Sequence, residues 1–343
     1  MVGTLALAVV AAVVCVWWGT PIPWMIGPLL VTAVVSLAGA PTRSHPPLRN
    51  AGQWIVGTAL GLYFTPQVAA LIGQLWWALV LGVLWALWLG WLMARWMVWF
   101  NARQLGLPPE QMRSTAYFAS AIGGASEMTL LADRWGARAD LVAAAHSLRV
   151  LLVTLSVPFA IQFWGVSGLD AASLERPPIT PAMGLWLALA TGAGAWVFLR
   201  LRRANPWFMG ALLVSLAWSV SGGLQASLPT WLTNAAQLCI GVSLGVRFRP
   251  AFLHTAPRWL GSVALGTLGL MVACTALAWA LAHFTGQHLA TLVLATAPGG
   301  IAEMAITAKV LALGVPVVTA FQATRLVAVL LLVGPIYRWG YLR

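Results

Sequence analysis

Long apolar stretches without a formal charge dominate the chain. Segments 1–41, 50–94, 204–246 and 259–302 contain no Asp, Glu, Lys or Arg. Each is long enough for about two helical passes through a hydrocarbon layer of roughly 30 Å, at about 1.5 Å per residue. Prolines, glycines and polar residues divide the pattern into six predicted helices in each half: 2–18, 24–40, 51–64, 68–99, 114–132 and 139–164, then 181–199, 206–222, 230–248, 257–284, 289–309 and 316–337.

The composition excludes a water-soluble fold. Hydrophobic residues make up 61% of the chain and charged residues only 8%, whereas a soluble protein has about 25% charged residues. We therefore expect an all-α polytopic membrane protein that is embedded in the lipid bilayer. The net charge of +12 is assigned to loop arginines that orient the helices. Nucleic acid is not expected as a partner, because no basic run lies in a soluble module that could reach it.

The cysteines give no sign of a metal site. Cys15, Cys239 and Cys274 lie inside apolar stretches, without a CxxC pair or a histidine at ligand spacing. The sequence therefore predicts no metal and no cofactor, and we do not expect an enzyme.

Three motifs occur twice in the same order, at a nearly constant offset along the chain. The pairs are Pro23-Trp24-x-x-Gly27 with Pro206-Trp207-x-x-Gly210, Gln53-x3-Gly57-x3-Gly61 with Gln237-x3-Gly241-x3-Gly245, and Gly123-Gly124-x-x-Glu127 with Gly299-Gly300-x-x-Glu303, the last followed by Arg149 and Arg325. Such a series indicates a duplicated sequence. We place the first repeat at 1–166, the second at 180–343 and a polar linker at 167–179.

Loop charges at matching positions disagree between the two repeats. Arg43 and Arg49 correspond to the uncharged segment 222–229, and the uncharged segment 65–74 corresponds to the basic segment 247–258. Basic loops mark the cytoplasmic side of a membrane. The two repeats are therefore expected to be inverted relative to each other, which requires an odd number of crossings in each.

Segments 114–132 and 289–309 are the candidates that do not cross. Glycines interrupt both, and each arm is long enough for only about half of the bilayer. We predict two re-entrant or broken helices and about ten transmembrane helices, with both termini cytoplasmic, in a bacterial cytoplasmic (inner) membrane. Alternatively, each of these two segments is a continuous but unwound helix that crosses the membrane. In that case a short segment such as 51–64 would be the one that does not span it.

Four charged residues stand where loops cannot explain them. Glu127 and Glu303 lie just after the glycine breaks, and Arg149 and Arg325 lie nine or more residues into the next apolar segments. A charge at membrane depth is costly unless it faces a cavity or a partner, so these residues are functional candidates. The arginines could pair with the glutamates or bind an anionic substrate bidentately, and both interpretations stay open.

The glycine breaks, Gly123-Gly124 and Gly299-Gly300, are themselves candidates for a binding site. Unpaired backbone groups are tolerated in lipid only where they line a cavity or are buried in protein. Amide groups that open the second arm, such as that of Ser126, would favour an anion, and carbonyls that end the first arm could hold a cation. Inverted repeats with paired discontinuous helices are typical of secondary transporters.

Four polar residues are secondary candidates. Glycines spaced four apart after Gln53 and Gln237 predict close helix packing, and the two glutamines could line the site. His146, one turn before Arg149, corresponds to Gln322. We favour a hydrogen-bonded core histidine over a proton relay.

The doubled motif resembles a known family. It consists of Gly123-Gly124-Ala125-Ser126-Glu127-Met128 with Ser147-Leu148-Arg149, and of Pro298-Gly299-Gly300-Ile301-Ala302-Glu303-Met304 with Arg325. These residues resemble the AbrB-type duplicated membrane-protein family, also labelled as ammonia monooxygenases or regulators of aidB expression. That family resembles inverted-repeat transporters with an elevator motion, and the resemblance implies a homodimer. The first motif has Ile122 where the second has Pro298, so the two hairpins need not share a role.

The function expected from these features is secondary transport of a small anionic organic solute, coupled to H⁺ or Na⁺ by alternating access. Glu127 and Glu303 would carry the coupling ion, while Arg149 and Arg325 would bind substrate or balance charge. A membrane sensor or regulatory protein that binds a ligand without transporting it is the alternative. A monooxygenase would need metal-ligand clusters and a DNA-binding regulator a basic soluble module, and the sequence contains neither.

Overall fold

The computed structural model describes residues 1–343 except 102–104, 169–175, 223–225, 249, 251–256 and 341–343, so that residues 169–175 of the predicted linker lie outside the described residues. Regular structure in the described part is helical, apart from an isolated bridge between Pro178 and Ser227. The helices are α1 (Val2–Trp17), α2 (Pro23–Leu37), α3 (Pro46–Gly61), α4 (Pro66–Gln74), α5 (Trp76–Asn101), α6 (Pro109–Ser120), α7 (Ala125–Arg134), α8 (Ala139–Phe163), α9 (Pro181–Arg200), α10 (Pro206–Val220), α11 (Thr230–Gly245), α13 (Pro257–Thr285), α14 (Leu289–Thr296), α15 (Ile301–Val310) and α16 (Val315–Gly340).

Prolines and glycines set many of the helix boundaries. Helices α2, α3, α6, α9 and α10 all have a proline in their first turn, where the missing N–H has no partner within the helix. Gly136 and Gly286 follow the ends of α7 and α13 with φ values of +65° and +68°. Glycine adopts this left-handed conformation without strain, and it therefore terminates helices well.

Several helices are suited to a membrane. Five of them, α5, α8, α9, α13 and α16, are long and apolar enough to cross one, and α3 with α4 would make a sixth if this pair, bent by 88°, counted as a single span. Helices α1, α2 and α10 are apolar but contain only 16, 15 and 15 residues, which is roughly 22–24 Å of helix. The chain is thus a helical membrane protein, and the ten crossings stay a prediction.

One predicted helix is wrong. The sequence pattern predicts a single helix over 68–99, but α4 ends at Gln74 and α5 begins at Trp76. Gly73 and Gln74 stand at this division, and glycine has a low helix propensity. The hydropathy pattern alone does not reveal the interruption, because apolar residues continue on both sides.

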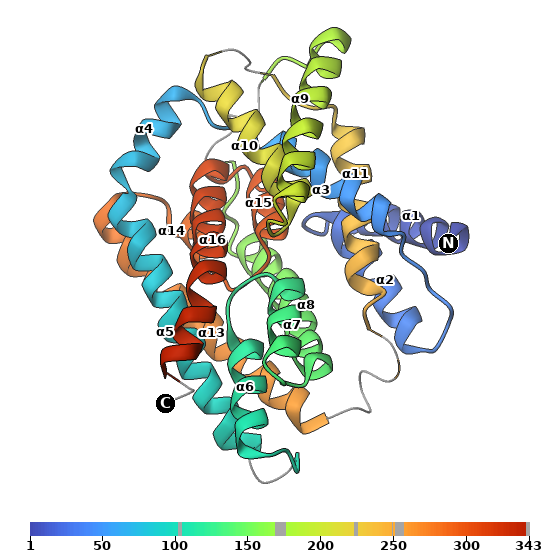
Figure 1. Ribbon diagram of the computed structural model, residues 1–343. Helices are drawn as coiled ribbons and strands as arrows, with labels where there is room; N and C mark the ends of the chain where they lie inside the picture. Colours follow the sequence, from blue (N-terminus) through green and yellow to red (C-terminus); the bar gives the residue numbers. More distant parts are fainter. Residues whose placement is uncertain (102–104, 169–175, 223–225, 249, 251–256, 341–343) are drawn as a thin grey trace. The chain divides into compact units, whose positions relative to one another are not determined.

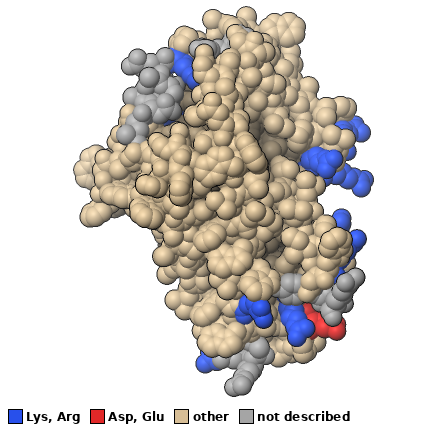
Figure 2. Space-filling model, turned by 90° about the vertical axis from the view of Figure 1, so that its left-hand side faces the viewer, with Lys and Arg blue, Asp and Glu red and all other residues tan. Residues whose placement is uncertain are grey.

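Large apolar side chains remain exposed on the surface. On α9, Leu185, Trp186 and Leu189 are all more than half exposed. On the face shown in Figure 2, acidic and basic side chains are few and most of the surface consists of other residues. An apolar surface of this kind marks contact with a membrane or another protein, in agreement with a membrane-embedded chain.

The helices group into two compact units. Unit 1 consists of Met1–Gln74, Pro158–Pro250 and Ala302–Thr319, and unit 2 of Leu75–Val157, Ala251–Ile301 and Ala320–Arg343. Each unit therefore takes helices from both halves of the chain.

Unit 1 is built from the same helix contact made twice. Helix α3 packs against α10, and α11 packs against α2 (Figure 1). A Cβ atom on Gly61 of α3 would lie 2.6 Å from the carbonyl oxygen of Leu212, and one on Gly245 of α11 would lie 2.6 Å from that of Leu29. The two glycines occupy corresponding positions of the repeats, and so do the two leucines. The predicted close packing of these glycines is confirmed.

Unit 2 has an apolar core around the interrupted helices. Helix α5 packs against α6 and α13, and α13 packs against α14. Met97, Phe118, Met128 and Trp259 are among the fully covered residues of this core. The Trp259 indole also donates a hydrogen bond of 3.1 Å to the carbonyl of Leu141 on α8. Tyr117, Phe118 and Ala119 bring the last turn of α6 into this core.

Candidate functional site

The first interruption is the tip of a hairpin. Helix α6 ends at Ser120 and α7 begins at Ala125. The Gln111 side chain at the start of α6 donates to the Gly136 carbonyl beyond α7 (3.0 Å), and the Arg138 backbone N–H donates to the Thr115 hydroxyl (3.0 Å). The chain therefore returns to the level where it started. Helices α6 and α7 therefore form a hairpin, and its re-entry into the membrane stays a prediction.

Arg149 holds the end of α6. Its side chain is 3% exposed and projects from α8. Nη1 donates to the carbonyls of Ala119 and Ser120 (both 3.4 Å), and Nη2 donates to that of Ala121 (2.9 Å). These carbonyls have no partner within the helix and form the negative end of its dipole. The guanidinium thus caps the interrupted helix.

Arg325 holds the end of α14 in the same way. Its side chain is 7% exposed and projects from α16. Nη1 donates to the carbonyls of Thr296 (3.1 Å) and Ala297 (2.7 Å), and Nη2 donates to that of Gly299 (3.1 Å). Thr296 and Ala297 precede Arg325 by 29 and 28 positions, and Ser120 and Ala121 precede Arg149 by the same intervals. The cap is therefore duplicated along with the sequence.

The hydrogen-bond inventory of the two guanidiniums is nearly complete. Arginine carries four N–H groups on its Nη atoms and one on Nε. Carbonyls take three of the four Nη hydrogens of Arg149, and the fourth meets Nδ1 of His146 at 2.7 Å. In Arg325 the fourth meets Oε1 of Gln322. Only the two Nε–H groups lack an acceptor among the described residues.

His146 and Gln322 perform the same task with different chemistry. Nε2 of His146 lies 2.9 Å from the Phe118 carbonyl while Nδ1 faces Arg149. Nε2 of Gln322 donates to the Leu294 carbonyl (2.8 Å) while Oε1 faces Arg325. A neutral histidine with its proton on Nε2 satisfies both contacts. This arrangement agrees with the core histidine that the sequence favours.

Glu127 lies over the start of α7. Its carboxylate occupies the space that a side chain on Gly124 would need, close to the positive end of the α7 dipole. The other glycine of this break, Gly123, faces Val329 of α16, to which a Cβ atom would come within 3.0 Å. Ser126, next to Glu127, has an exposed side chain. A side chain on Gly124 would therefore displace the Glu127 carboxylate.

Glu303 stands in a different environment. It lies in the first turn of α15, is 8% exposed, and interacts electrostatically with Arg247 and Arg49. Burial lowers the pKa of Arg247, Arg49 lowers it further, and Glu303 opposes this effect. The preceding Gly300 is half-buried. These three charged groups all belong to unit 1.

An ion pair between the glutamates and the deep arginines is one of the two interpretations that the sequence leaves open. Among the residues that the structure describes, the salt bridge with an N–O distance within 4.0 Å joins Arg138 and Asp140, at 2.6 Å. It involves neither glutamate and neither deep arginine. Arg149 and Arg325 instead contact helix carbonyls. The secondary candidates Gln53 and Gln237 lie on α3 and α11 in unit 1, whereas the two arginines lie in unit 2.

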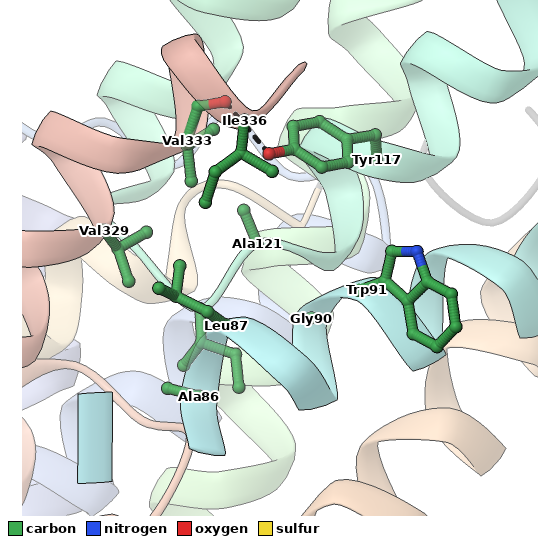
Figure 3. A pocket seen from close by; sticks show the side chains of 10 residues that line it. Ala86, Leu87, Gly90, Trp91, Tyr117, Ala121, Val329, Val333 and Ile336 are labelled. Carbon is green, nitrogen blue, oxygen red and sulfur yellow. Dashed lines mark hydrogen bonds between the residues drawn. The ribbon is translucent and has the colours of Figure 1, made fainter. Parts of the chain in front are cut away.

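Each capped helix end borders a small cavity in unit 2. The cavity beside α6 measures about 30 Å³ and is lined by Ala121, Val329 and Val333 among others. Figure 3 shows Tyr117 at its edge, where the hydroxyl donates to the Val333 carbonyl at 2.9 Å. The cavity beside α14 measures about 10 Å³, and Arg325 is part of its wall.

Comparison with known proteins places the chain in a family. The family model described as "Transition state regulatory protein AbrB" matches residues 24–340. The chain belongs to the AbrB family. It is 28% identical over 318 residues to a protein of Escherichia coli (strain K12) named provisionally as regulator AbrB, with 91% of this chain and 88% of that protein covered. It is 27% identical over 344 residues to the uncharacterized protein YhjN of Bacillus subtilis (strain 168), with 93% and 88% covered.

Sequence reasoning missed two features of this AbrB-family site. The carbonyl acceptors of Arg149 and Arg325 carry no signature in the side-chain sequence, because every residue has a carbonyl. Trp85 lies in the wall of the α14 cavity, but the sequence shows it only as one of many tryptophans in an apolar segment. The motif residues of the AbrB family therefore identify the helix breaks and leave the cavity beside them unmarked.

Proposed function

We propose that this AbrB-family chain is a secondary transporter of a small anionic organic solute in a bacterial cytoplasmic membrane. It works by alternating access between two inverted repeats, with both termini in the cytoplasm. The main support is the duplicated cap, in which Arg149 and Arg325 hold the ends of two interrupted helices at corresponding positions. Interrupted helices inside membrane proteins line binding sites, because their backbone groups are otherwise unsatisfied in lipid.

The capped ends favour H⁺ over Na⁺ as the coupling ion. In transporters with discontinuous helices, carbonyls at the C-terminal ends of half-helices coordinate the coupling cation. Here guanidinium groups occupy those carbonyls at α6 and α14. We therefore assign proton coupling to the carboxylates of Glu127 and Glu303, which stand at the starts of the second arms.

Reconstitution tests this function. The full chain in liposomes is supplied with labelled mono- and dicarboxylates under an imposed pH gradient or Na⁺ gradient. We expect accumulation of at least one anion with the pH gradient and no response to Na⁺. Glu303→Gln should abolish this accumulation, while Glu110→Gln, which changes an exposed glutamate, should not. Equal behaviour of Glu303→Gln and wild type across the panel would contradict the proposal.

A membrane sensor is the second candidate, and the regulator name of the Escherichia coli relative favours it. A sensor would bind the same anion without moving it. Two measurements together separate the two functions. Both a sensor and a transporter bind the anion in detergent, but only a transporter accumulates it in liposomes under a gradient.

A further inference from the structure

A cluster of three charged side chains lies in unit 1 at the start of α15. Glu303 is 8% exposed and interacts electrostatically with Arg247 and Arg49, and these two arginines also act on each other. Arg247 lies two residues after the end of α11, and Arg49 lies near the start of α3. Within the described ranges, these two arginines are the charged side chains that act on Glu303. The cluster therefore brings together residues from three parts of one unit.

The two guanidiniums of this cluster are not bound to other protein groups. Arg247 and Arg49 are partly buried, and in the part of the chain that the structure describes neither side chain has a hydrogen-bond acceptor or a salt bridge within 4.0 Å. Their nitrogens are also not among the enclosed, unpartnered atoms of that part, so a small molecule can reach them. Arg149 and Arg325, by contrast, donate to helix carbonyls. Arg247 is therefore a better candidate for a substrate arginine than either of them.

The charge balance of the cluster is positive. Two guanidiniums and one carboxylate leave one positive charge on the side chains. The N-terminus of α15 at Glu303 and that of α3 near Arg49 each add roughly +0.5, and the C-terminus of α11 before Arg247 adds roughly −0.5. Protonation of Glu303 raises the balance by one more charge, which is costly for partly buried groups. A single negative charge from a ligand would offset this cost.

The first repeat provides an internal comparison. Glu127 corresponds to Glu303, but Tyr63 stands at the position that corresponds to Arg247. Arg176 lies over the Tyr63 ring, at 4.8 Å from its centroid, and donates to the Leu62 carbonyl. The first repeat thus lacks an arginine of its own at this position, and the arginine found there contacts a helix end. The two repeats therefore differ in the surroundings of their glutamates.

The carboxylate of Glu303 indicates the chemistry of such a ligand. A guanidinium presents a planar set of donors that matches the two oxygens of a carboxylate. Once Glu303 is protonated, the carboxylate of a ligand can take over its negative charge without any change in the balance of the cluster. A monocarboxylate matches this exchange, whereas a dicarboxylate would bring a second charge and a cation would add to the repulsion.

We propose that Arg247 and Arg49 bind the carboxylate of a small monocarboxylate, and that ionised Glu303 competes with this ligand for the two guanidiniums. A proton on Glu303 ends the competition, so proton binding and anion binding strengthen each other. The proposal rests on the proposed function, since it names the substrate class and the way in which H⁺ is coupled to it. It also holds for a sensor, because it concerns binding.

Equilibrium dialysis of the full chain in detergent with labelled acetate, lactate and benzoate tests the site. Wild type should bind at least one of them, about tenfold or more tighter at acidic than at alkaline pH. Glu303→Gln, which mimics the protonated glutamate, should bind it with equal affinity at both. Arg247→Gln should bind it about tenfold or more weaker at acidic pH, since hydrogen bonds to a charged group are lost. Arg203→Gln, which changes an exposed arginine of the same unit, should bind it as the wild type does.

The site is overturned if neither wild type nor Glu303→Gln binds any of the three anions, if Glu303→Gln keeps the pH dependence of the wild type, or if Arg247→Gln binds as tightly as Arg203→Gln. Tight binding by Glu303→Gln at alkaline pH is a gain that a misfolded chain would not show, so the test does not depend on the fold of Arg247→Gln. The expected binding without accumulation in liposomes would support the site and contradict transport. Gradient-driven carboxylate uptake that Arg247→Gln does not change would support transport and overturn the site.

Discussion

Exchanging His146 and Gln322 between the two repeats tests the cap mechanism most directly. Each side chain accepts from an arginine Nη2 and faces a helix carbonyl with its other polar atom. We therefore expect His146→Gln and Gln322→His to preserve the cap. The informative comparisons are His146→Ala and Gln322→Ala, which remove both contacts.

The magnitude follows from the groups that alanine leaves unsatisfied. In His146→Ala the Phe118 carbonyl loses a contact of 2.9 Å, and Arg149 Nη2 loses one of 2.7 Å. Each buried unsatisfied group costs about 1–3 kcal/mol, so the free energy of unfolding should fall by about 2–6 kcal/mol. His146→Gln keeps both contacts and should change it by less than about 1.5 kcal/mol, as for other swaps of similar volume.

Equilibrium unfolding of the detergent-purified chain, followed by circular dichroism, measures these differences, and uptake into liposomes is recorded for the same variants. A His146→Gln variant as unstable as His146→Ala would refute the cap explanation. A stable His146→Gln variant that no longer responds to a pH gradient would show instead that the histidine relays protons.

Two further predictions concern other parts of the molecule. Gly57→Ala should lower the free energy of unfolding by about 1–3 kcal/mol, because its methyl group would overlap a backbone carbonyl of α10, whereas Gly269→Ala, with nothing within 4 Å, should not. Equal stability in the unfolding assay would contradict the close packing of α3. Gly124→Ala should displace the Glu127 carboxylate and abolish pH-driven uptake in liposomes, and normal uptake would show that this position is unimportant.

The helix breaks can be predicted because they depend on local chemistry. Gly123-Gly124 and Gly299-Gly300 fall within the interruptions at 121–124 and 297–300. Glycine has a low helix propensity, and two adjacent glycines in the middle of an apolar segment predict a break, whereas a single glycine such as Gly57 stays within its helix. The duplication is visible for a similar reason, since its motifs consist of glycines and charges whose spacing survives in an otherwise uniform apolar sequence.

The partners of the charged residues cannot be predicted from the same pattern. An arginine in an apolar helix looks the same whether a carboxylate, a ligand or a helix end neutralises it. Arg149 and Arg325 meet carbonyls some 28 residues away in the chain, and only the fold, which brings each arginine to a helix end, selects them. Trp85 likewise is one of 21 tryptophans, and its position beside a cavity depends on the fold.

The crossed packing of unit 1 has a consequence for biosynthesis. Helix α3 ends at Gly61, and its partner α10 begins only at Pro206. At about 5–20 residues per second, the ribosome needs roughly 7–29 s to make the stretch between them. During this interval the glycine face of α3 lacks its partner α10. The first half of the chain must therefore persist in the membrane as an incomplete intermediate until the second half emerges and provides the missing surfaces.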